Sequence, residues 1–228
     1  METFEREFKL RIASEQQLHA LIRHLGGASA PPVLQVNHFF DTAERALHAE
    51  HFSLRLRAES GVFTLTLKGP QQPGPGSLAV RPEEELEVPA AEAGRILDGT
   101  RSALQLLRTA RAETALHRRA SAMVGTKPLR RLGSFQNERL RLGPLRFPPD
   151  SAGPELIFEL DRTHLPDGTI ARELELELPA GVAPAPVAAA LERLLSDLGI
   201  PLESAPSKAA LFFRILDELR PVPGPTNL

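Results

Sequence analysis

Charged side chains of one sign recur at every second position in several parts of this chain. Carboxylates alternate in this way at Glu5 and Glu7, at Glu83, Glu85 and Glu87, and at Glu173, Glu175 and Glu177. Alternation with period two predicts strands, and residues two apart in a strand lie about 6.5–7 Å from each other on one face. Stacked carboxylates repel one another unless cations lie between them. The sequence has cations at alternating positions as well: Lys9, Arg55, Arg57, Lys68, Arg81, Arg139 and Arg141.

This charge pattern suits a bound polyanion that carries a divalent metal. Arginine and lysine bind phosphate oxygens, and carboxylates are the ligands that Mg²⁺ and Mn²⁺ prefer. About eight strands can close into a barrel. Polar faces turned inward would then make a wet tunnel, because buried charges must be paired or bind ions. The simpler alternative for any single strand is an antiparallel sheet with one face in water.

Composition narrows the class of protein. The 228 residues have a net charge of −2, with 42% hydrophobic and 25% charged residues, which is typical of a globular protein. No apolar run reaches the roughly 18 to 20 residues that a membrane-spanning helix needs. The chain also lacks the excess of basic residues that is typical of nucleic-acid-binding proteins. The chain has no cysteine, so metal ligands must be oxygen or histidine. We expect a cytoplasmic protein with no nucleic-acid or membrane partner.

Hydrophobic periodicity predicts about eight strands with helices at the start, middle and end of the chain, which is the pattern of an α+β fold. The predicted strands are 4–12, 33–42, 52–57, 62–68, 81–88, 133–142, 155–162 and 170–178. Helices are expected at about 15–25, 90–122, 187–198 and 206–219. No linker divides the chain, so residues 1–220 are predicted to form one domain, followed by a flexible proline-rich tail at 221–228.

The ordered motifs of the chain resemble those of the CYTH domain, the triphosphate tunnel metalloenzyme superfamily. Glu5-Arg6-Glu7-Phe8-Lys9 is similar to the ExExK signature of that family. A lone ExExK is weak, but the further matches follow in the family's order: Phe40-Asp41-Thr42, Leu54-Arg55-Leu56-Arg57, Thr66-Leu67-Lys68-Gly69, Arg81-x-Glu83-x-Glu85, Arg139, Glu159-Leu160-Asp161, Glu173-Leu174-Glu175 and Ser207-Lys208. The resemblance covers residues 2 to about 220.

The resemblance implies an α+β fold, an eight-stranded antiparallel β-barrel (tunnel) with flanking α-helices. It further implies that this tunnel hydrolyses a triphosphate compound with Mg²⁺ or Mn²⁺. It implies metal binding by Glu5, Glu7, Glu173 and Glu175, with Glu159 and Asp161 as further carboxylates for metal or water. It implies that seven basic residues bind the phosphates and act in catalysis: Lys9, Arg55, Arg57, Lys68, Arg81, Arg139 and Lys208. The expected substrate is inorganic triphosphate or a similar small triphosphate, with polyphosphate as a further candidate. The expected state is a monomer or homodimer.

Three positions depart from the family pattern. Phe39 stands where tyrosine is common in relatives. Asn137 stands where relatives often have a second basic residue, and Arg141 is the candidate replacement. Pro82 removes a hydrogen-bond donor from the strand at 81–88, which predicts a bulge or an irregular edge there. Two alternative functions stay open: a class IV-type adenylyl cyclase, and a non-catalytic module that binds polyphosphate or nucleotide. The sequence has no distinctive adenine-binding residues, and a pure anion binder gains nothing from the carboxylates.

Overall fold

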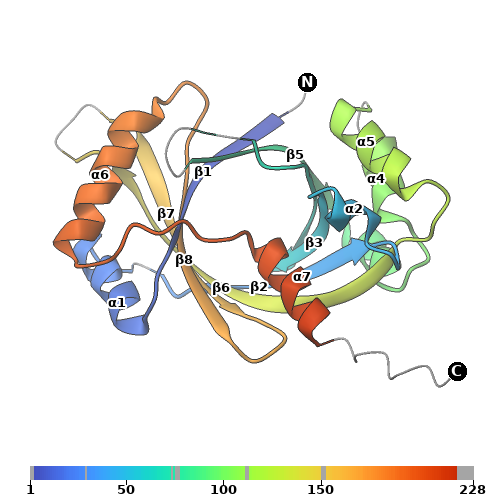
Figure 1. Cartoon of the computed structure of the whole chain (residues 1–228), viewed down its shortest axis with the longest axis horizontal. Helices are drawn as coiled ribbons and strands as arrows, with labels where there is room; N and C mark the ends of the chain where they lie inside the picture. The colour runs from blue at the N-terminus through green and yellow to red at the C-terminus, as the bar shows by residue number, and fades with distance from the viewer. Residues whose placement is uncertain are drawn as a thin grey trace, which may run out of the picture.

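Eight antiparallel strands form a closed barrel in the order β1-β5-β4-β3-β2-β6-β7-β8 (Figure 1). The computed structural model describes residues 3–28, 30–72, 74, 78–110, 113–149 and 153–219. The strands are β1 Thr3–Arg11, β2 Val33–Asp41, β3 Ser53–Glu59, β4 Val62–Lys68, β5 Leu78–Val88, β6 Arg130–Arg146, β7 Glu155–His164 and β8 Ile170–Glu177. The predicted barrel is confirmed, and the predicted tail at 221–228 lies outside the described residues.

Helices flank the barrel as predicted, and the helical segment at 90–122 is interrupted at Gly99-Thr100 as the sequence predicts, but it has a further break before Thr114 and so contains three helices. The helices are α1 Glu15–His24, α2 Ala46–Ala49, α3 Ala90–Leu97, α4 Ala103–Ala110, α5 Ala115–Val124, α6 Pro184–Asp197 and α7 Lys208–Glu218. Gly99 follows the end of α3 with φ +82, a left-handed conformation that terminates helices. Thr114 starts α5 anew, because its side chain accepts a hydrogen bond from the N–H of His117. None of these helices is long and apolar enough to cross a membrane.

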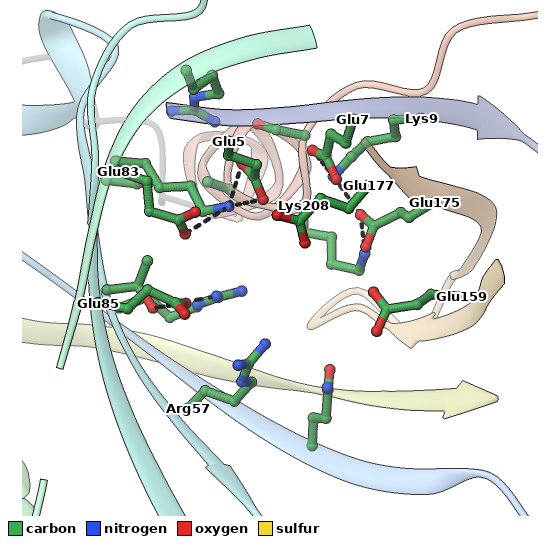
Figure 2. A pocket seen from close by; sticks show the side chains of 18 of the residues that line it. Glu5, Glu7, Lys9, Arg57, Glu83, Glu85, Glu159, Glu175, Glu177 and Lys208 are labelled. Atoms are coloured by element: carbon green, nitrogen blue, oxygen red, sulfur yellow. Dashed lines mark hydrogen bonds and ion pairs between the residues drawn. The ribbon is translucent and has the colours of Figure 1, made fainter. Parts of the chain in front are cut away.

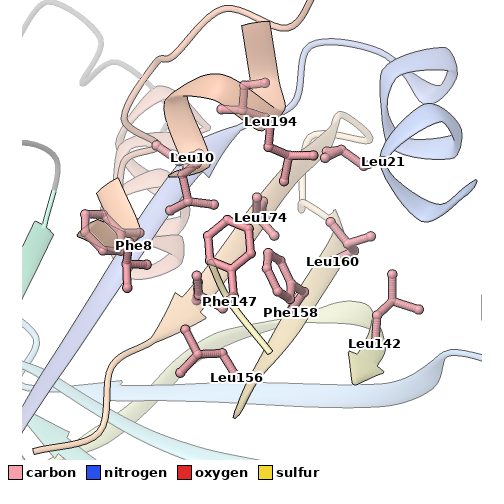
Figure 3. Close-up of a cluster of buried hydrophobic side chains, with 14 of the residues drawn as sticks. Phe8, Leu10, Leu21, Leu142, Phe147, Leu156, Phe158, Leu160, Leu174 and Leu194 are labelled. Carbon is pink, nitrogen blue, oxygen red and sulfur yellow. The ribbon is translucent and has the colours of Figure 1, made fainter. Parts of the chain in front are cut away.

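The two large apolar clusters lie on the outer side of the barrel wall, beneath helices. One buried cluster joins β1, β6, β7 and β8 to α1 and α6 (Figure 3), and includes Phe8, Leu10, Phe158, Leu174 and Leu194. A second joins β3 and β4 to α3, α4 and α5. Burying each large apolar side chain stabilises the fold by roughly 1.5–3 kcal/mol. The core therefore lies between wall and helices, and the charged faces are left to line the interior.

Helix α7 lies across the ring of strands in Figure 1 and packs against its inner face. Phe212 of α7 stacks on Phe39 of β2 with ring centroids 4.9 Å apart, and both belong to a small aromatic cluster with Phe135 and Phe213. Ser207 caps the helix by accepting a hydrogen bond from the N–H of Ala210. This packing fixes the first turn of α7, and with it Lys208, at the interior of the barrel.

The bulge expected at Pro82 does not occur, because the described β1–β5 register runs continuously through this residue. On the other side, β5 pairs with β4 over Glu83–Val88, so Pro82 lies just beyond that ladder. The Pro82 carbonyl accepts a hydrogen bond from the N–H of Gly69, the first residue after β4, so the missing proline donor falls where the β4 ladder ends. The register shifts of the barrel occur instead along β6, beside Gly133 and between Leu142 and Leu145.

Candidate active site

Charged side chains from seven of the eight strands and from α7 line a cavity inside the barrel, which we call the bore; β2 contributes Gln35 and Phe39. In β1 the residues Glu5, Glu7 and Lys9 face the bore, whereas Phe8 and Leu10, which alternate with them, are buried in the outer core. The charged lining residues are Glu5, Glu7, Lys9, Arg55, Arg57, Lys68, Arg81, Glu83, Glu85, Arg139, Arg141, Glu159, Glu175, Glu177 and Lys208. The inward orientation that the charge pattern predicts is therefore confirmed.

Most predicted site residues line the bore directly, and two lie just behind its surface. Asp161 of β7 and Glu173 of β8 are Cα partners in the β7–β8 ladder, and they are 0% and 2% exposed. Asp161, Glu173 and Glu175 each offer a carboxylate oxygen, and these oxygens lie within 4.8 Å of one another. Such an all-oxygen set has the chemistry of a site for Mg²⁺ or Mn²⁺.

Two cations from distant segments join this acidic cluster. Lys208 of α7 forms ion pairs with Asp161 at 2.7 Å and with Glu175 at 2.9 Å, and it also contacts Glu173. Arg139 of β6 donates two hydrogen bonds to Asp161, at 2.8 and 2.6 Å, and pairs with Glu175 as well. Burial opposes the charge of Arg139, but Glu175 and Asp161 raise its pKa. The cations thus separate the carboxylates, as the repulsion between stacked carboxylates requires.

A second group of charges joins β1 to β4 and β5. Lys68 pairs with Glu5 at 2.5 Å and with Glu83 at 3.1 Å. Although burial opposes ionisation of Glu5, Lys68 lowers its pKa to about 2. Burial opposes ionisation of Glu7 as well, and there it outweighs the attraction of Lys9 and raises the pKa to about 7. The bore therefore contains both a carboxylate that stays ionised and one that exchanges its proton near neutral pH.

Two arginines of β3 form no ion pair with a carboxylate of any described residue. Arg57 forms no ion pair or hydrogen bond with any described residue, and the only bond of Arg55 is a long one of 3.5 Å to the hydroxyl of Thr66. The buried Nε atoms of both arginines lack a partner among the described residues. Figure 2 shows Arg57 extending into the same cavity as Glu85, Glu159 and Glu175. This wall of the bore therefore offers positive charge that the protein itself does not neutralise.

Arg81 also lines the bore, but backbone oxygens hold it in place. Its guanidinium donates to the carbonyl of Gly69 at 2.9 Å from Nε and at 2.8 Å from Nη2. Burial lowers the pKa of Arg81, yet an arginine stays charged at neutral pH because its ordinary pKa lies far above it. A guanidinium fixed through one edge presents its other edge to a ligand in a defined orientation.

The structure distinguishes between Asn137 and Arg141, which the sequence leaves unresolved. Asn137 is 0% exposed, and its amide donates to Gln35 at 2.9 Å and accepts from Thr163 at 2.8 Å. Arg141 lines the bore and pairs with Glu59 at 2.7 Å and with Glu159 at 3.0 Å. The cation at this end of the bore is therefore Arg141.

Several lining residues are absent from the predicted site. Glu83, Glu85 and Glu177 share the alternation of the predicted carboxylates, so the sequence contains a signal for them. Gln35 and Thr66 carry no such signal, because neutral side chains on a strand are common on any surface. Glu177 lies opposite Glu7 in the β1–β8 ladder; burial and the charge of Glu5 raise the pKa of Glu177.

Comparison with known protein families assigns the chain to a family. The family model of the CYTH domain matches residues 3–213. The chain belongs to the CYTH domain family. The resemblance that the ordered motifs indicate is thereby confirmed over nearly the whole chain. Among curated proteins, no sequence match to this CYTH domain protein is found.

Solved structures share the same tunnel fold. An adenylyl cyclase candidate from Hippeastrum, described as revealing a dominant triphosphatase activity, is 28% identical with a TM-score of 0.73, over 92% of this chain and 95% of its own. An adenylate cyclase candidate from Bacillus halodurans is 22% identical with a TM-score of 0.63, over 93% and 98%. The PH1819 protein from Pyrococcus horikoshii is 15% identical with a TM-score of 0.57, over 92% and 99%. The last two support the fold alone.

Proposed function

We propose that this CYTH domain protein hydrolyses inorganic triphosphate, or a similar small triphosphate, with the help of a divalent metal. One observation carries the proposal: a buried cluster of carboxylates and two arginines without acidic partners belong to one barrel interior. The cluster of Asp161, Glu173 and Glu175 suits a hard cation, and Arg55 and Arg57 suit phosphate oxygens. A phosphate chain that carries a metal would bind the carboxylate cluster through the metal and the two arginines through its phosphate oxygens.

The buried carboxylates would hold the metal. Asp161, Glu173 and Glu175 form the proposed centre, and we assign Glu5, Glu7 and Glu159 as further carboxylates that hold metal or orient the attacking water. When bound, Mg²⁺ or Mn²⁺ would offset negative charge on the phosphate oxygens and polarise the phosphorus. The ion cannot be chosen from the donor set, since both metals prefer oxygen ligands.

The cations would hold the substrate and the charge that develops on it. We assign this role to Lys9, Arg55, Arg57, Lys68, Arg81, Arg139 and Lys208. The oxygen of a water attacks the terminal phosphorus, the bond from that phosphorus to its bridging oxygen breaks, and diphosphate leaves. Phosphoryl transfer of this kind depends on positioning and electrostatic stabilisation more than on covalent chemistry. Arg141, anchored by Glu59 and Glu159, is the added cation that takes the place of a basic residue at Asn137.

The lining of the bore favours a small inorganic substrate over a nucleotide. Among the described lining residues Phe39 is the aromatic one, and it is 2% exposed because Phe212 stacks on it. An adenine ring would therefore find no open aromatic surface in the bore. The triphosphatase activity described for the Hippeastrum relative also supports hydrolysis over cyclisation. The intact acidic cluster argues against a module that only binds anions.

A phosphate-release assay tests this proposal. The protein is given tripolyphosphate, thiamine triphosphate, ATP and long polyphosphate in turn, with Mg²⁺, with Mn²⁺ or with chelator. We expect metal-dependent phosphate release that is fastest with a small triphosphate. Release of cyclic AMP from ATP without hydrolysis of tripolyphosphate would instead establish the cyclase. Tight binding of tripolyphosphate with no turnover under any metal would establish the binding module.

Two glutamate variants make the assay specific to the bore. Glu173→Gln removes a carboxylate from the buried cluster, and it should abolish metal-dependent turnover while the barrel still folds. Glu138→Gln is the matched control, because Glu138 lies on the outer face of β6 beside His164 and Arg162. The control should keep full activity. Wild-type turnover in Glu173→Gln would remove that residue from the metal site.

A further inference from the structure

One buried amide in the barrel wall has no hydrogen-bond partner in the part of the chain that the structure describes. Asn37 of β2 is 1% exposed, and neither its Oδ1 nor its Nδ2 forms a hydrogen bond with any described residue. Folded proteins satisfy nearly all buried polar atoms, so an exception needs an explanation. A whole amide group left without partners is a larger exception than a single atom.

The position of Asn37 in the sheet points its side chain toward the bore. Gln35 and Phe39, two residues before and after it on β2, both line the cavity, and side chains two apart share a face. Asn37 is the Cα partner of Arg57 in the β2–β3 ladder. Side chains opposite each other in such a ladder have Cβ atoms about 4.5–5.5 Å apart. The unpartnered amide is therefore the immediate neighbour of the unpartnered guanidinium.

The neighbouring buried amides of the wall, by contrast, form hydrogen bonds within the protein. Asn137 donates to Gln35 at 2.9 Å and accepts from Thr163 at 2.8 Å. Gln35 in turn donates to Glu59 at 2.6 Å. The wall therefore satisfies its other buried amides within the protein. Asn37 and Arg57 are therefore adjacent polar groups that have no hydrogen-bond partner among the described residues.

We propose that Asn37 is a substrate-binding residue that, together with Arg57, contacts one phosphate group of the oligophosphate in the bore. In the proposed complex, Nδ2 donates to a phosphate oxygen that Arg57 also binds, and the guanidinium of Arg57 turns from its present position so that Oδ1 accepts a hydrogen bond from it. Phosphate oxygens accept hydrogen bonds, and such bonds are strong because the acceptor is charged. This inference rests on the proposed binding of a triphosphate, but not on the proposed hydrolysis.

Two matched leucine variants test the proposal. Asn37→Leu and Asn137→Leu each replace a fully buried amide by an apolar side chain of similar size. Affinity for tripolyphosphate is measured by calorimetry in the presence of chelator, so that binding is read without turnover, and stability is measured by thermal unfolding. We expect Asn37→Leu to bind tripolyphosphate about tenfold more weakly, as the loss of a bond to a charged group implies, with an unchanged or raised Tm. Asn137→Leu should lower the Tm, because it leaves Gln35 and Thr163 without their partner.

Asn37→Asp adds a signature that a structural role would not give. The new carboxylate would pair with Arg57 and repel phosphate, so the Tm should rise while affinity falls further than in Asn37→Leu. Wild-type affinity in Asn37→Leu, or a loss of Tm as large as that of Asn137→Leu, would overturn the inference. Weaker binding by Asn37→Leu in a protein that hydrolyses nothing would leave the inference standing and refute the proposed hydrolysis. If the wild type does not bind tripolyphosphate, both fail.

Discussion

Glu175 of β8 lies directly opposite Lys9 of β1, and the two side chains form an ion pair of 2.5 Å inside the bore. The same carboxylate also pairs with Lys208 of α7 at 2.9 Å and with Arg139 of β6. Cations from three elements that are far apart in the sequence therefore meet at one glutamate. Glu175 also belongs to the buried carboxylate cluster, so it connects the proposed metal centre to the proposed phosphate-binding groups.

Glu175→Gln should impair both stability and activity. An amide of the same shape cannot neutralise Lys9, Arg139 and Lys208, and loss of one partner from a buried ion pair costs about 3–5 kcal/mol. We expect metal-dependent phosphate release to fall by about 100-fold or more, since both the metal and the cations lose a ligand. Steady-state kinetics and urea unfolding measure the two effects. Glu175→Asp, which keeps the charge, should recover part of each; equal losses in both variants would mean that shape and not charge matters.

The sequence predicts which face of each strand is charged, because period two is a property of the strand itself. It cannot tell whether that face points inward or outward, and the closed barrel makes that choice by burying Phe8 and Leu10 beneath the helices. The register that sets Lys9 opposite Glu175 depends on pairing between distant strands, which a local pattern does not contain. The missing partners of Asn37 were unpredictable for the same reason. A neutral amide has no sequence signal, and its lack of bonds is visible only in three dimensions.

Stability should depend on pH through Glu15, outside the bore. This first residue of α1 accepts hydrogen bonds from Arg162 at 3.0 Å and from Arg172 at 2.8 Å, and the bond from Arg162 is the main reason that its pKa is lowered to about 2. Because the folded pKa lies below the ordinary value of 4.5, this stabilisation is complete above pH 4.5 and disappears as the pH falls toward 2.

Glu15→Gln should therefore destabilise the protein near neutral pH but not in acid. The side chain is 39% exposed, so solvent screens the interaction and the expected loss is about 1 kcal/mol at pH 7. Urea unfolding of both proteins across pH 2–7 measures the difference. Glu203→Gln is the control, because its pair with Arg11 is more exposed on both sides. A difference that stays constant down to pH 2 would contradict the assigned cause.

The far end of α7 should also matter for stability. Arg45 is 8% exposed and pairs with Asp217 at 2.6 Å, while its guanidinium lies 5.6 Å from the ring centroid of Phe213. We expect Arg45→Ala to cost about 1–2 kcal/mol, because both contacts to α7 are lost. Asp217→Asn should cost less, since Asp217 is largely exposed. A double-mutant cycle by urea unfolding isolates the pair, and a coupling energy near zero would show that α7 is held by its aromatic residues alone.

Two arginines in the bore should respond in opposite ways to the same substitution. Arg55 has no carboxylate partner among the described residues, whereas Arg139 pairs with Glu159, Asp161 and Glu175. Arg55→Gln removes a charge that the folded protein does not neutralise, so the Tm should stay unchanged or rise. Its KM for tripolyphosphate should rise about tenfold or more, because a charge-assisted phosphate contact is lost.

Arg139→Gln should lower the Tm, because it leaves buried carboxylates unpaired. Thermal unfolding and steady-state kinetics distinguish the two variants, and both are measured at low salt, where exposed charges are least screened. A Tm for Arg55→Gln that falls as far as that of Arg139→Gln would mean that Arg55 supports the fold and not the substrate.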